Sequence, residues 1–574
     1  MLQIEKLTIT HRKDLRIILE EFQMVLNDGE KAVIIGEEGN GKSTLMKWIY
    51  DPELVDHYAE CEGRRITGGE KLGYLPQELP VADRKKTVYE FFAEEPFFYE
   101  QTPRELAMYA REFHVEQDFF YQDQRMESLS GGEKIKAQMM RLLMQQPTVL
   151  LLDEPSNDID IQTLEWLEKI INEWPHIVLY ISHDETLIEN TANMVIHMEQ
   201  IQRKTQSRYT VAHMPYRQYV EERLHKFEKQ EQQAASDRRE KKIRDEKYRK
   251  IYQSVEHAQA SISRQDPFGA KLLKKKMHSV KSVEKRFARE DENMTEMPEQ
   301  EEAIFFKLGD AGSAVPAGKT VLEYKLDQLT IPTAEQILAQ DTYGLDQLTM
   351  PATEQVPAQD TCGSDQLTTP AVEQILTQDM YKADQLAAPD GGRVLAKNIF
   401  LRIRGPEKIC IIGTNGCGKT TLLKKIAQEL LARTDIRAEY MPQNYEELLD
   451  LTATPVDFLD KTGDKEERTR IRTYLGSLKY TADEMEHPIA ELSGGQKAKI
   501  FLLKMSLSGA NVLILDEPTR NFSPLSGPVI RKMLREFPGA IISISHDRKY
   551  IEECCEKVYR LDKAGLQEAA DLKF

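Results

Sequence analysis

The stretch GEEGNGKS at residues 36–43 decides the fold, because it fits the pattern G-x-x-x-x-G-K-[ST] of a phosphate-binding loop. A short apolar run precedes it and a segment of helical character follows it, which is the strand–loop–helix context that the pattern requires. The pattern returns in the same context as GTNGCGKT at residues 413–420. Each copy predicts a nucleotide site, because glycine-rich backbone N–H groups and the N-terminus of a helix together bind phosphate oxygens.

Four further motifs also occur twice and in the same order. They are PQ at residues 76–77 and 442–443, LSGG at 129–132 and 492–495, an apolar run ending in DEP at 149–155 and 512–518, and ISHD at 181–184 and 544–547. In each half the LSGG serine and the DEP glutamate are 24 positions apart, and that glutamate and the ISHD histidine are 29 apart. An apolar run before an acidic pair is typical of a buried parallel strand that carries the acids at its C-terminal end. We therefore predict an α/β protein with two P-loop ATPase domains.

Together these motifs resemble those of twin ATP-binding-cassette (ABC) ATPases, over residues 1–212 and 300–574. The resemblance implies two ABC-type domains packed head to tail, with ATP and Mg²⁺ as cofactors. Each ATP is then held between the phosphate loop of one half and the LSGG motif of the other. Ser130 is expected to face the ATP on Lys419, and Ser493 is expected to face the ATP on Lys42.

The resemblance also implies a role for each motif residue. The expected ATP-binding residues are Gly36, Gly39, Gly41, Lys42, Ser43, Thr44, Gln77, Ser130, Gly131 and Gly132 in the first half, and Gly413, Gly416, Gly418, Lys419, Thr420, Thr421, Gln443, Ser493, Gly494 and Gly495 in the second. The expected Mg²⁺ ligands are Ser43, Gln77, Asp153, Thr420, Gln443 and Asp516. The expected catalytic residues are Glu154 and Glu517, which polarise the attacking water, and His183 and His546, which contact the γ-phosphate. Taken alone, Gln77 or His183 is typical of a solvated polar residue at a strand end, and only the ordered repetition favours a functional role.

The loop after the glutamate differs between the two halves. Residues 155–160 read PSNDID and end in an aspartate, as is usual in the family that the motifs resemble, whereas residues 518–524 read PTRNFSP and lack it. Since this loop couples the two sites in that family, we predict two unequal ATPase sites. His11 is a candidate for stacking on adenine in the first half, and the second half offers no such candidate.

Residues 213–290 differ in character from the rest of the chain. They carry 21 Lys and Arg against 12 Asp and Glu, in a protein whose net charge is −18. Apolar residues recur at helical spacing over 216–258 and again over 273–287, which predicts two antiparallel helices joined by a turn near 261–270. A solvated coiled-coil spacer is the alternative, but a basic arm on an acidic chain favours a nucleic-acid partner. The predicted units are a first cassette at 1–212, an α-helical hairpin linker at 213–293 and a second cassette at 294–574.

Two cassettes, a basic hairpin and no membrane-spanning stretch together resemble the ABC-F proteins, which act on ribosomes. The long linker and the stretch at 517–524 resemble the antibiotic-resistance branch of that family from Gram-positive bacteria. The resemblance implies a cytoplasmic ribosomal protection factor that binds the E-site region and places its linker tip near the peptidyl-transferase centre. It would contact rRNA and P-site tRNA, displace a lincosamide, streptogramin A or pleuromutilin, and leave after ATP hydrolysis. The candidate contact residues at the tip are Phe268, Lys271, Lys274, Lys275 and Lys276.

Other interpretations stay open at this point. Phe268 follows Pro267, and packing of the turn explains an aromatic residue there as well as contact with RNA does. One alternative function is a housekeeping ABC-F translation factor, which regulates or rescues elongation without drug resistance. Another is the ATPase subunit of a drug exporter, although that function leaves the basic hairpin without a role.

Composition excludes several other classes. No stretch approaches the ~18–20 continuous apolar residues of a membrane-spanning helix, and the N-terminus lacks a secretory signal pattern, so we expect neither a membrane nor a separate transmembrane subunit as partner. The six cysteines show no zinc-site or disulfide spacing, which indicates the reduced thiols of a cytosolic protein. We expect a monomer in which the two cassettes of one chain pair.

A 19-residue repeat interrupts the start of the second cassette. It begins at Asp327 and restarts at Asp346, Asp365 and, in part, Asp384. Removal of 327–383 restores an ordinary strand–turn–strand, so we predict that the copies expanded a surface turn into a flexible acidic loop without chemistry. A partner-binding role is the alternative.

Overall fold

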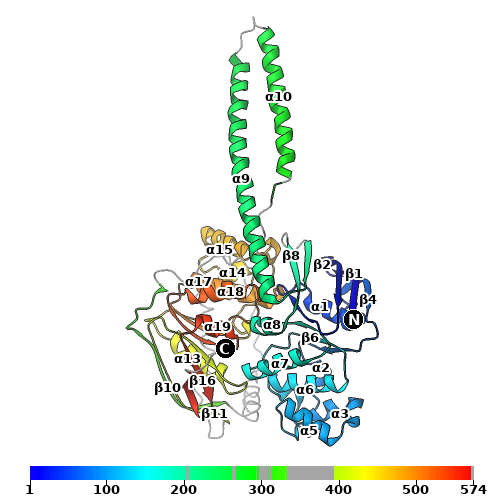
Figure 1. Ribbon diagram of the computed structural model, residues 1–574. Helices are drawn as coiled ribbons and strands as arrows, with labels where there is room; N and C mark the ends of the chain where they lie inside the picture. The colour runs from blue at the N-terminus through cyan, green and yellow to red at the C-terminus, as the bar shows by residue number, and fades with distance from the viewer. Residues whose placement is uncertain are drawn as a thin grey trace, which may run out of the picture.

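The structure, a computed structural model, describes residues 1–201, 206–261, 267–292, 294–295, 308, 313–331 and 393–569. Two α/β cassettes lie side by side, and a long helical hairpin projects from them (Figure 1). The first cassette is coloured blue to cyan and the second yellow to red, so each comes mainly from one half of the chain. Within the described ranges, no helix is long and apolar enough to cross a membrane.

The core of the first cassette is a six-stranded sheet in the order β5-β6-β7-β3-β8-β9. Its strands are β3 (Lys31–Ile35), β5 (Leu72–Leu75), β6 (Val149–Asp153), β7 (Ile177–Ile181), β8 (Met194–Ile201) and β9 (Gln206–Ala212). All neighbours are parallel except β9, which runs antiparallel to β8. β3, β6 and β7 are buried at every position because both faces of the sheet are covered, which explains their continuous apolar sequences. Their carboxyl ends share one edge, where the phosphate loop, Asp153 and His183 are found.

Different layers cover the two faces of this sheet. One face packs against α1 and the antiparallel sheet β2-β1-β4, and the other packs against α6, α7, α8 and a group of short helices. The elements are β1 (Leu2–His11), β2 (Ile17–Leu26), α1 (Lys42–Tyr50), β4 (Ala59–Ile66), α2 (Val81–Arg84), α3 (Val88–Ala93), α4 (Pro96–Glu100), α5 (Pro103–Glu112), α6 (Gly131–Met144), α7 (Ile161–Glu173) and α8 (Glu185–Thr191). The LSGG serine begins α6: Ser130 Oγ accepts the backbone N–H of Glu133, and the Glu133 side chain accepts that of Ser130. This capping box fixes the N-terminus of α6 at the interface with the second cassette.

The second cassette repeats the first in strand order. Its six-stranded sheet is β13-β14-β15-β12-β16-β17, again parallel except for the last strand. The elements are β10 (Thr320–Ile331), β11 (Arg393–Arg404), β12 (Lys408–Ile412), α13 (Lys419–Leu431), β13 (Ala438–Met441), α14 (Pro455–Leu459), α15 (Lys465–Ser477), α16 (Ala482–Glu486), α17 (Gly494–Ser508), β14 (Val512–Asp516), α18 (Gly527–Arg535), β15 (Ala540–Ile544), α19 (Arg548–Cys554), β16 (Lys557–Asp562) and β17 (Gly565–Glu568). The predicted α/β fold with two ABC-type domains is therefore confirmed.

The hairpin β10–β11 shows where the repeat insertion is attached. β10 continues through the start of the first repeat as far as Ile331, which pairs with Arg393 of β11. Within this extension Leu329 is buried and pairs with Ala396, which anchors the added residues in the hairpin. The paired strands therefore extend past the predicted boundary at residue 327, and residues 332–392 lie outside the described ranges. This end of the hairpin lies against the second phosphate loop: a Cβ on Gly418 would meet Leu395 at 2.7 Å and Leu329 at 2.9 Å.

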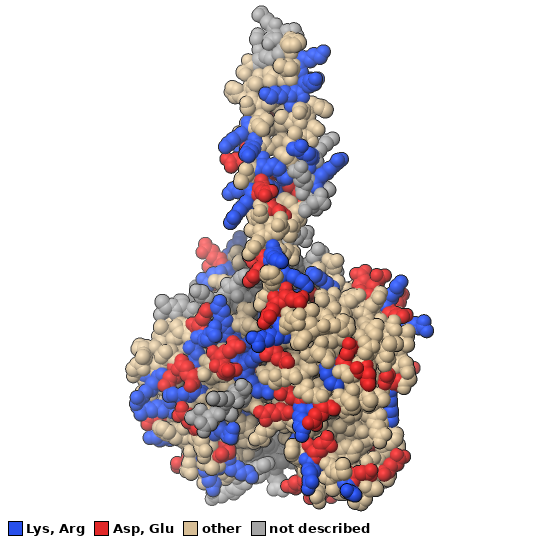
Figure 2. All heavy atoms as spheres, viewed as in Figure 1, with Lys and Arg blue, Asp and Glu red and all other residues tan. Residues whose placement is uncertain are grey.

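The linker forms the predicted pair of helices. α9 (Tyr216–Ser261) has 46 residues, about 69 Å at 1.5 Å per residue, and α10 (Pro267–Glu292) runs beside its upper part (Figure 1). Tyr248 packs edge-on against Phe287 at 5.9 Å between ring centroids, and Lys241 lies 2.8 Å from Asp291. Lys and Arg side chains stand out along this arm, whereas the cassettes show both signs of charge (Figure 2). The sequence predicts the turn near 261–270, but Ser261 still belongs to α9 and residues 267–270 already belong to α10; residues 262–266 are not described.

The apolar stripe predicted on α9 is only partly buried. Val255 is buried between the helices, but Leu224 and Ile251 are exposed to 56% and 53%. Spacing along one helix places both on the apolar side, but the position of α10 decides which of these side chains is covered. α9 is held at its base by the first cassette, where the Tyr219 hydroxyl and a ring nitrogen of His197 are 2.8 Å apart, and α9 also packs against α8 and β8.

Candidate ATP sites at the cassette interface

A cavity of about 900 Å³ lies between the phosphate loop of the second cassette and the LSGG motif of the first. Its lining includes most of the residues predicted for this site: Ser130, Gly131, Gly416, Gly418, Lys419, Thr420, Thr421, Gln443, Asp516, Glu517 and His546. The two halves of the chain therefore meet as the motifs predict, with Ser130 facing Lys419. In the opposite direction, Gly495 of the second LSGG motif contacts Glu38 of the first phosphate loop.

The two phosphate loops hold their lysines in the same way. Lys42 Nζ donates to the backbone carbonyls of Gly36 at 2.9 Å and Glu37 at 3.1 Å, and Lys419 Nζ donates to those of Gly413 and Thr414 at the same distances. Each ammonium group thus lies inside its own loop, where the oxygens of a phosphate can replace the carbonyls. The loop ends in a residue of left-handed conformation, with φ of 84° at Gly41, and a Cβ there would meet Ile18 at 2.1 Å.

In the first cassette, two of the residues predicted to bind Mg²⁺, Ser43 and Asp153, lie side by side. Ser43 Oγ donates to Asp153 Oδ1 at 2.9 Å, and the Tyr74 hydroxyl donates to Asp153 Oδ2 at 3.2 Å. Burial and the charge of the neighbouring Glu154 together raise the pKa of Asp153 to about 6. A hydroxyl beside a buried carboxylate fits Mg²⁺, which prefers oxygen ligands and a compensating negative charge.

The corresponding carboxylate of the second cassette also fits a cation. Both oxygens of Asp516 are buried without a hydrogen-bond partner among the described residues. Burial raises the pKa of Asp516 to about 6. A buried carboxylate without a partner is costly unless a charged ligand compensates it, so the residues present fit Mg²⁺ at this position as well.

Glu154 of the first cassette is held by three side chains. Gln77 Nε2 donates to Glu154 Oε2 at 2.8 Å, Asn157 Nδ2 donates to the same oxygen at 2.5 Å, and His183 Nε2 lies 3.3 Å from Oε1. Burial raises the pKa of Glu154, but the hydrogen bond and charge of His183 and the charge of Lys42 outweigh it, and the pKa falls to about 2. Glu154 is therefore an oriented, ionised carboxylate, which is the form that can polarise a water.

Glu517 of the second cassette has different surroundings. It accepts the backbone N–H of His546 at 3.2 Å, and His546 Nε2 is 3.7 Å away. Gln443 does not bridge to Glu517 as Gln77 does to Glu154; its amide donates to Asp158 of the first cassette at 3.3 Å. Burial and the charge of Asp516 raise the pKa of Glu517 to about 8, so the two glutamates differ in protonation at neutral pH.

The loops that follow Glu154 and Glu517 cross the interface, and they account for the different surroundings of the two glutamates. The loop of the second cassette gives the carbonyl of Phe522 to His183 Nδ1 at 2.8 Å. The loop of the first cassette gives Asp158, which pairs with Arg520 at 2.8 Å and whose carbonyl accepts the Asn415 amide at 2.6 Å. Neither contact has an equivalent on the other side among the described residues, so the unequal loops build unequal sites.

The aspartate that only the first loop carries has a structural role. Asp160 caps α7, because its carboxylate accepts the backbone N–H of Thr163 at 2.9 Å. In the second cassette Ser523 stands at the equivalent position, and α18 begins later, at Gly527, without a side-chain cap. The missing cap allows the second loop to continue into the interface as far as Phe522, which is buried.

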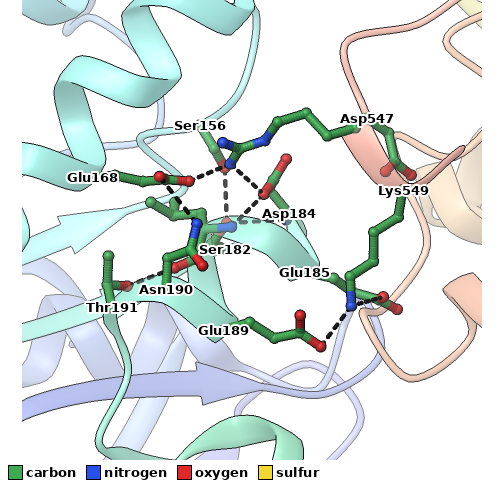
Figure 3. A network of polar contacts seen from close by, with 12 residues as sticks. Ser156, Glu168, Ser182, Asp184, Glu185, Glu189, Asn190, Thr191, Asp547 and Lys549 are labelled. Atoms are coloured by element: carbon green, nitrogen blue, oxygen red, sulfur yellow. Dashed lines mark hydrogen bonds and ion pairs between the residues drawn. The ribbon is translucent and has the colours of Figure 1, made fainter. Parts of the chain in front are cut away.

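Ion pairs join α8 of the first cassette to α18 and α19 of the second. Lys549 Nζ lies 3.1 Å from Glu185 and 2.5 Å from Glu189, and Figure 3 shows its side chain reaching down between them. Arg531 Nη2 lies 3.0 Å from Glu185, and both side chains are buried. Glu185 therefore has two cationic partners from the other half of the chain.

The residues that follow His183 and His546 also meet across this interface. Arg548, two residues after His546, contacts Glu168 and lies 3.5 Å from Asp184, which directly follows His183. Burial raises the pKa of Asp184 to about 6, although the charge of Arg548 opposes this shift. Charged contacts thus connect the segments that directly follow the two histidines.

Several residues of the interface were not found by motif analysis. Asn157, Asp158, Arg520 and the Phe522 carbonyl contact predicted site residues but belong to no repeated motif. One available signal was the opposite charge at equivalent positions, since α8 begins with a glutamate and α19 with an arginine. His11 lies at the end of β1, in a turn from which Arg16 donates to the Gly39 carbonyl at 3.3 Å; its stacking on adenine stays a prediction.

Two P-loop domains whose LSGG motifs face each other's phosphate loops define an ABC ATPase. The family model described as "ABC transporter" matches residues 19–157 and 396–520, one match in each cassette. The similar curated proteins include the putative ATP-binding protein YdiF of Bacillus subtilis, 25% identical over 99% of this chain and 81% of its own, and ABC transporter F family member 5 of Arabidopsis thaliana, 22% identical over 96% and 74%. Both cassettes are therefore ABC ATPase domains, which bind and hydrolyse ATP, and over most of its length the chain is similar to ABC-F proteins.

Solved structures are similar in fold. One is an archaeal ribosome recycling factor, aABCE1, in complex with a ribosomal stalk protein, with a TM-score of 0.53, 15% identity, and coverage of 98% of this chain and 89% of that one. This likeness extends over both cassettes and supports the paired arrangement. At this level of identity it concerns the fold alone.

Proposed function

We propose that this ABC-F ATPase is a cytoplasmic, ATP-dependent ribosomal protection factor. The observation that carries the proposal is the hairpin α9–α10, which projects far beyond the cassettes and presents basic side chains (Figure 2). Lysine and arginine neutralise RNA phosphates, so such an arm fits a narrow RNA-lined channel of a ribosome. aABCE1, which is similar to this chain in fold, is named as a ribosome recycling factor, and this analogy of fold adds support to a ribosomal function.

The described end of the arm has the side chains that RNA binding needs. Phe268 is 81% exposed, which favours an external partner over packing of the turn. Lys271, Lys274, Lys275 and Lys276 are exposed on the same helix. An exposed aromatic ring can stack on an unpaired base while lysines contact the adjacent phosphates.

The cassettes would move this arm through α8. The base of α9 packs against α8, and α8 follows His183, so closure of the cassettes on ATP changes the direction of the arm. In the proposed cycle the ATP-bound, closed form binds the ribosome E-site region. Hydrolysis then opens the cassettes and releases the protein.

The proposed chemistry uses the motif residues described above. Ser43 with Asp153, and Thr420 with Asp516, would hold Mg²⁺, and Gln77 and Gln443 would complete its surroundings. Mg²⁺, when bound, neutralises charge on the phosphates. Glu154, and Glu517 when its carboxyl is ionised, would orient and polarise the attacking water, and His183 and His546 would contact the γ-phosphate.

The finer part of the proposal is displacement of an antibiotic from the peptidyl-transferase centre. A lincosamide, streptogramin A or pleuromutilin binds where the tip of a hairpin entering from the E site would arrive beside P-site tRNA. The same hairpin also fits a housekeeping translation factor that acts on stalled ribosomes without a drug. An exporter ATPase gives the arm no role, so the two ribosomal functions rank above it.

Ribosome binding is tested first with the double variant Glu154→Gln/Glu517→Gln, which keeps ATP bound. We expect it to sediment with bacterial ribosomes in ATP but not in ADP. The matched control is the same variant with Phe268→Ala and the four tip lysines changed to glutamine, which should lose binding while its ATP affinity is retained. A double variant that never sediments with ribosomes contradicts the proposal.

Antibiotic displacement is tested by toeprinting on drug-stalled ribosomes with wild-type protein and ATP. Relief of stalling by a lincosamide or pleuromutilin, but not by a drug that binds elsewhere, is the result expected of a protection factor. Ribosome binding without relief of any drug would instead identify a translation factor.

A further inference from the structure

The first phosphate loop carries two glutamates, Glu37 and Glu38, and both reach the second cassette. The Glu38 carboxylate accepts the backbone N–H of Gly495, in the second LSGG motif. A Cβ built on Gly494 would lie 3.2 Å from Glu38 Oε2 and 3.3 Å from Oε1. The carboxylate therefore covers both glycines at the start of α17.

This position is where the first ATP would meet the second cassette. α17 has 15 residues and begins at the LSGG serine, Ser493, so its first N–H groups and its positive end face the first phosphate loop. A phosphate held on Lys42 would accept hydrogen bonds from the same N–H groups. A carboxylate and a γ-phosphate are both anions, and one N–H group cannot donate a full hydrogen bond to both at once.

The second site offers an internal comparison. Asn415 occupies the place of Glu38 in the loop pattern, and its neutral amide donates to the backbone carbonyl of Asp158 at 2.6 Å. Thr414 occupies the place of Glu37, whose carboxylate instead pairs with Lys499 of α17 at 3.1 Å. The two acidic residues thus belong to the first loop alone, and only Glu38 lies on the LSGG glycines.

We propose that Glu38 is an internal competitor for the γ-phosphate position of the first ATP site. Without nucleotide, its carboxylate holds the first phosphate loop against α17. ATP must displace it before its γ-phosphate reaches the N–H groups of Gly494 and Gly495, whereas ADP ends before that position and leaves the contact in place. Glu38 therefore lowers the preference of this site for ATP over ADP, and it keeps the cassettes in contact between nucleotides.

The test compares affinities for a triphosphate and a diphosphate at the first site. All proteins are full-length and carry Lys419→Ala to weaken the second site, and binding of the ATP analogue AMP-PNP and of ADP is measured by calorimetry with Mg²⁺. We expect Glu38→Asn to tighten AMP-PNP binding about tenfold and to change ADP binding less than about twofold. One unit of charge and one hydrogen bond are removed at an exposed loop position, so the fold is retained.

Glu37→Thr is the matched control, because it removes the same charge from the same loop at the residue paired with Lys499. We expect it to change AMP-PNP and ADP binding by similar factors, as a general effect of loop charge does. An equal gain for AMP-PNP and ADP in Glu38→Asn, or no gain, overturns the proposal. A selective gain for AMP-PNP in Glu37→Thr as large as that in Glu38→Asn overturns it as well.

Discussion

His183 of the first cassette and Phe522 of the second are joined by a hydrogen bond of 2.8 Å between the ring Nδ1 and the backbone carbonyl. The bond requires a proton on Nδ1, because a carbonyl only accepts, and it fixes the ring so that Nε2 lies 3.3 Å from a Glu154 oxygen. The counterpart His546 has no partner for its Nδ1 among the described residues. The histidine of the first site is therefore oriented by the opposite cassette before nucleotide arrives, and the histidine of the second site is not.

Unequal hydrolysis at the two sites is the first prediction. We expect Glu154→Gln to lower steady-state ATPase activity at neutral pH on the order of 10²-fold, because it removes an ionised, oriented base. Glu517→Gln should lower the activity less, since Gln443 does not hold Glu517 as Gln77 holds Glu154. The measurement is phosphate release without ribosomes, with nucleotide affinity of both variants as the control. Equal losses in the two variants contradict the prediction.

The second prediction concerns stability without nucleotide or metal. Glu517 has a pKa of about 8 in the folded chain, against roughly 4.3 in an unfolded one. Between these values the native state binds the extra proton, so the free energy of unfolding falls as pH rises. We expect a fall between pH 6.5 and 8 with a slope of up to about 1.4 kcal/mol per pH unit.

The control for this pH dependence is Glu517→Gln, which cannot titrate and should flatten the curve in that window. Asp153, Asp184 and Asp516, with pKa values of about 6, titrate mostly below this window. Burial lowers the pKa of His546 from 6.5 to about 3, so His546 opposes the fall only near pH 6.5, and it does so equally in both proteins. Thermal unfolding in EDTA provides the measurement. A wild-type curve that rises from pH 6.5 to 8 would refute the assigned protonation of Glu517.

The third prediction concerns the buried ion pair between the cassettes. Arg531→Ala leaves Glu185 buried with only Lys549 as a cationic partner, so we expect a loss of about 3 kcal/mol in the free energy of unfolding. Arg535→Ala on the same helix is the matched control, because Arg535 is exposed, and its effect should stay within about 0.5 kcal/mol. The free energy of unfolding is measured with denaturant. Similar losses for both variants would show that the buried pair contributes no more to stability than an exposed arginine does.

The fourth prediction concerns the salt dependence of ribosome binding and rests on the proposed function. Each phosphate contact contributes roughly 0.7–0.9 to the slope of log K against log salt, so Lys274→Gln/Lys275→Gln/Lys276→Gln should reduce that slope by about 2 to 3. The triple lysine-to-arginine variant keeps the charge and should keep the slope. A slope that is unchanged by the glutamine variant would show that these lysines do not contact phosphate.

The motif residues were predictable because each motif is also a local structure. A phosphate loop needs its glycines between a strand and a helix, and Ser130 begins α6 by a capping box that is visible in sequence. The contacts between Phe522 and His183, and between Glu38 and Gly495, were not predictable, because they depend on how two separately folded cassettes meet. The exposure of Ile251 has the same origin, since periodicity indicates an apolar side but does not place the neighbouring helix.

The charges along α8 and α19 have a consequence for assembly. α8 presents Glu185 and Glu189 to the interface, whereas α19 presents Arg548 and Lys549. If the first cassettes of two chains met in the same geometry, glutamate would face glutamate, and two second cassettes would oppose their cations. Like charges placed together cost several kcal/mol, so unlike halves are selected over like ones. The interface itself distinguishes the first cassette from the second, and it disfavours the pairing of two like cassettes from neighbouring molecules.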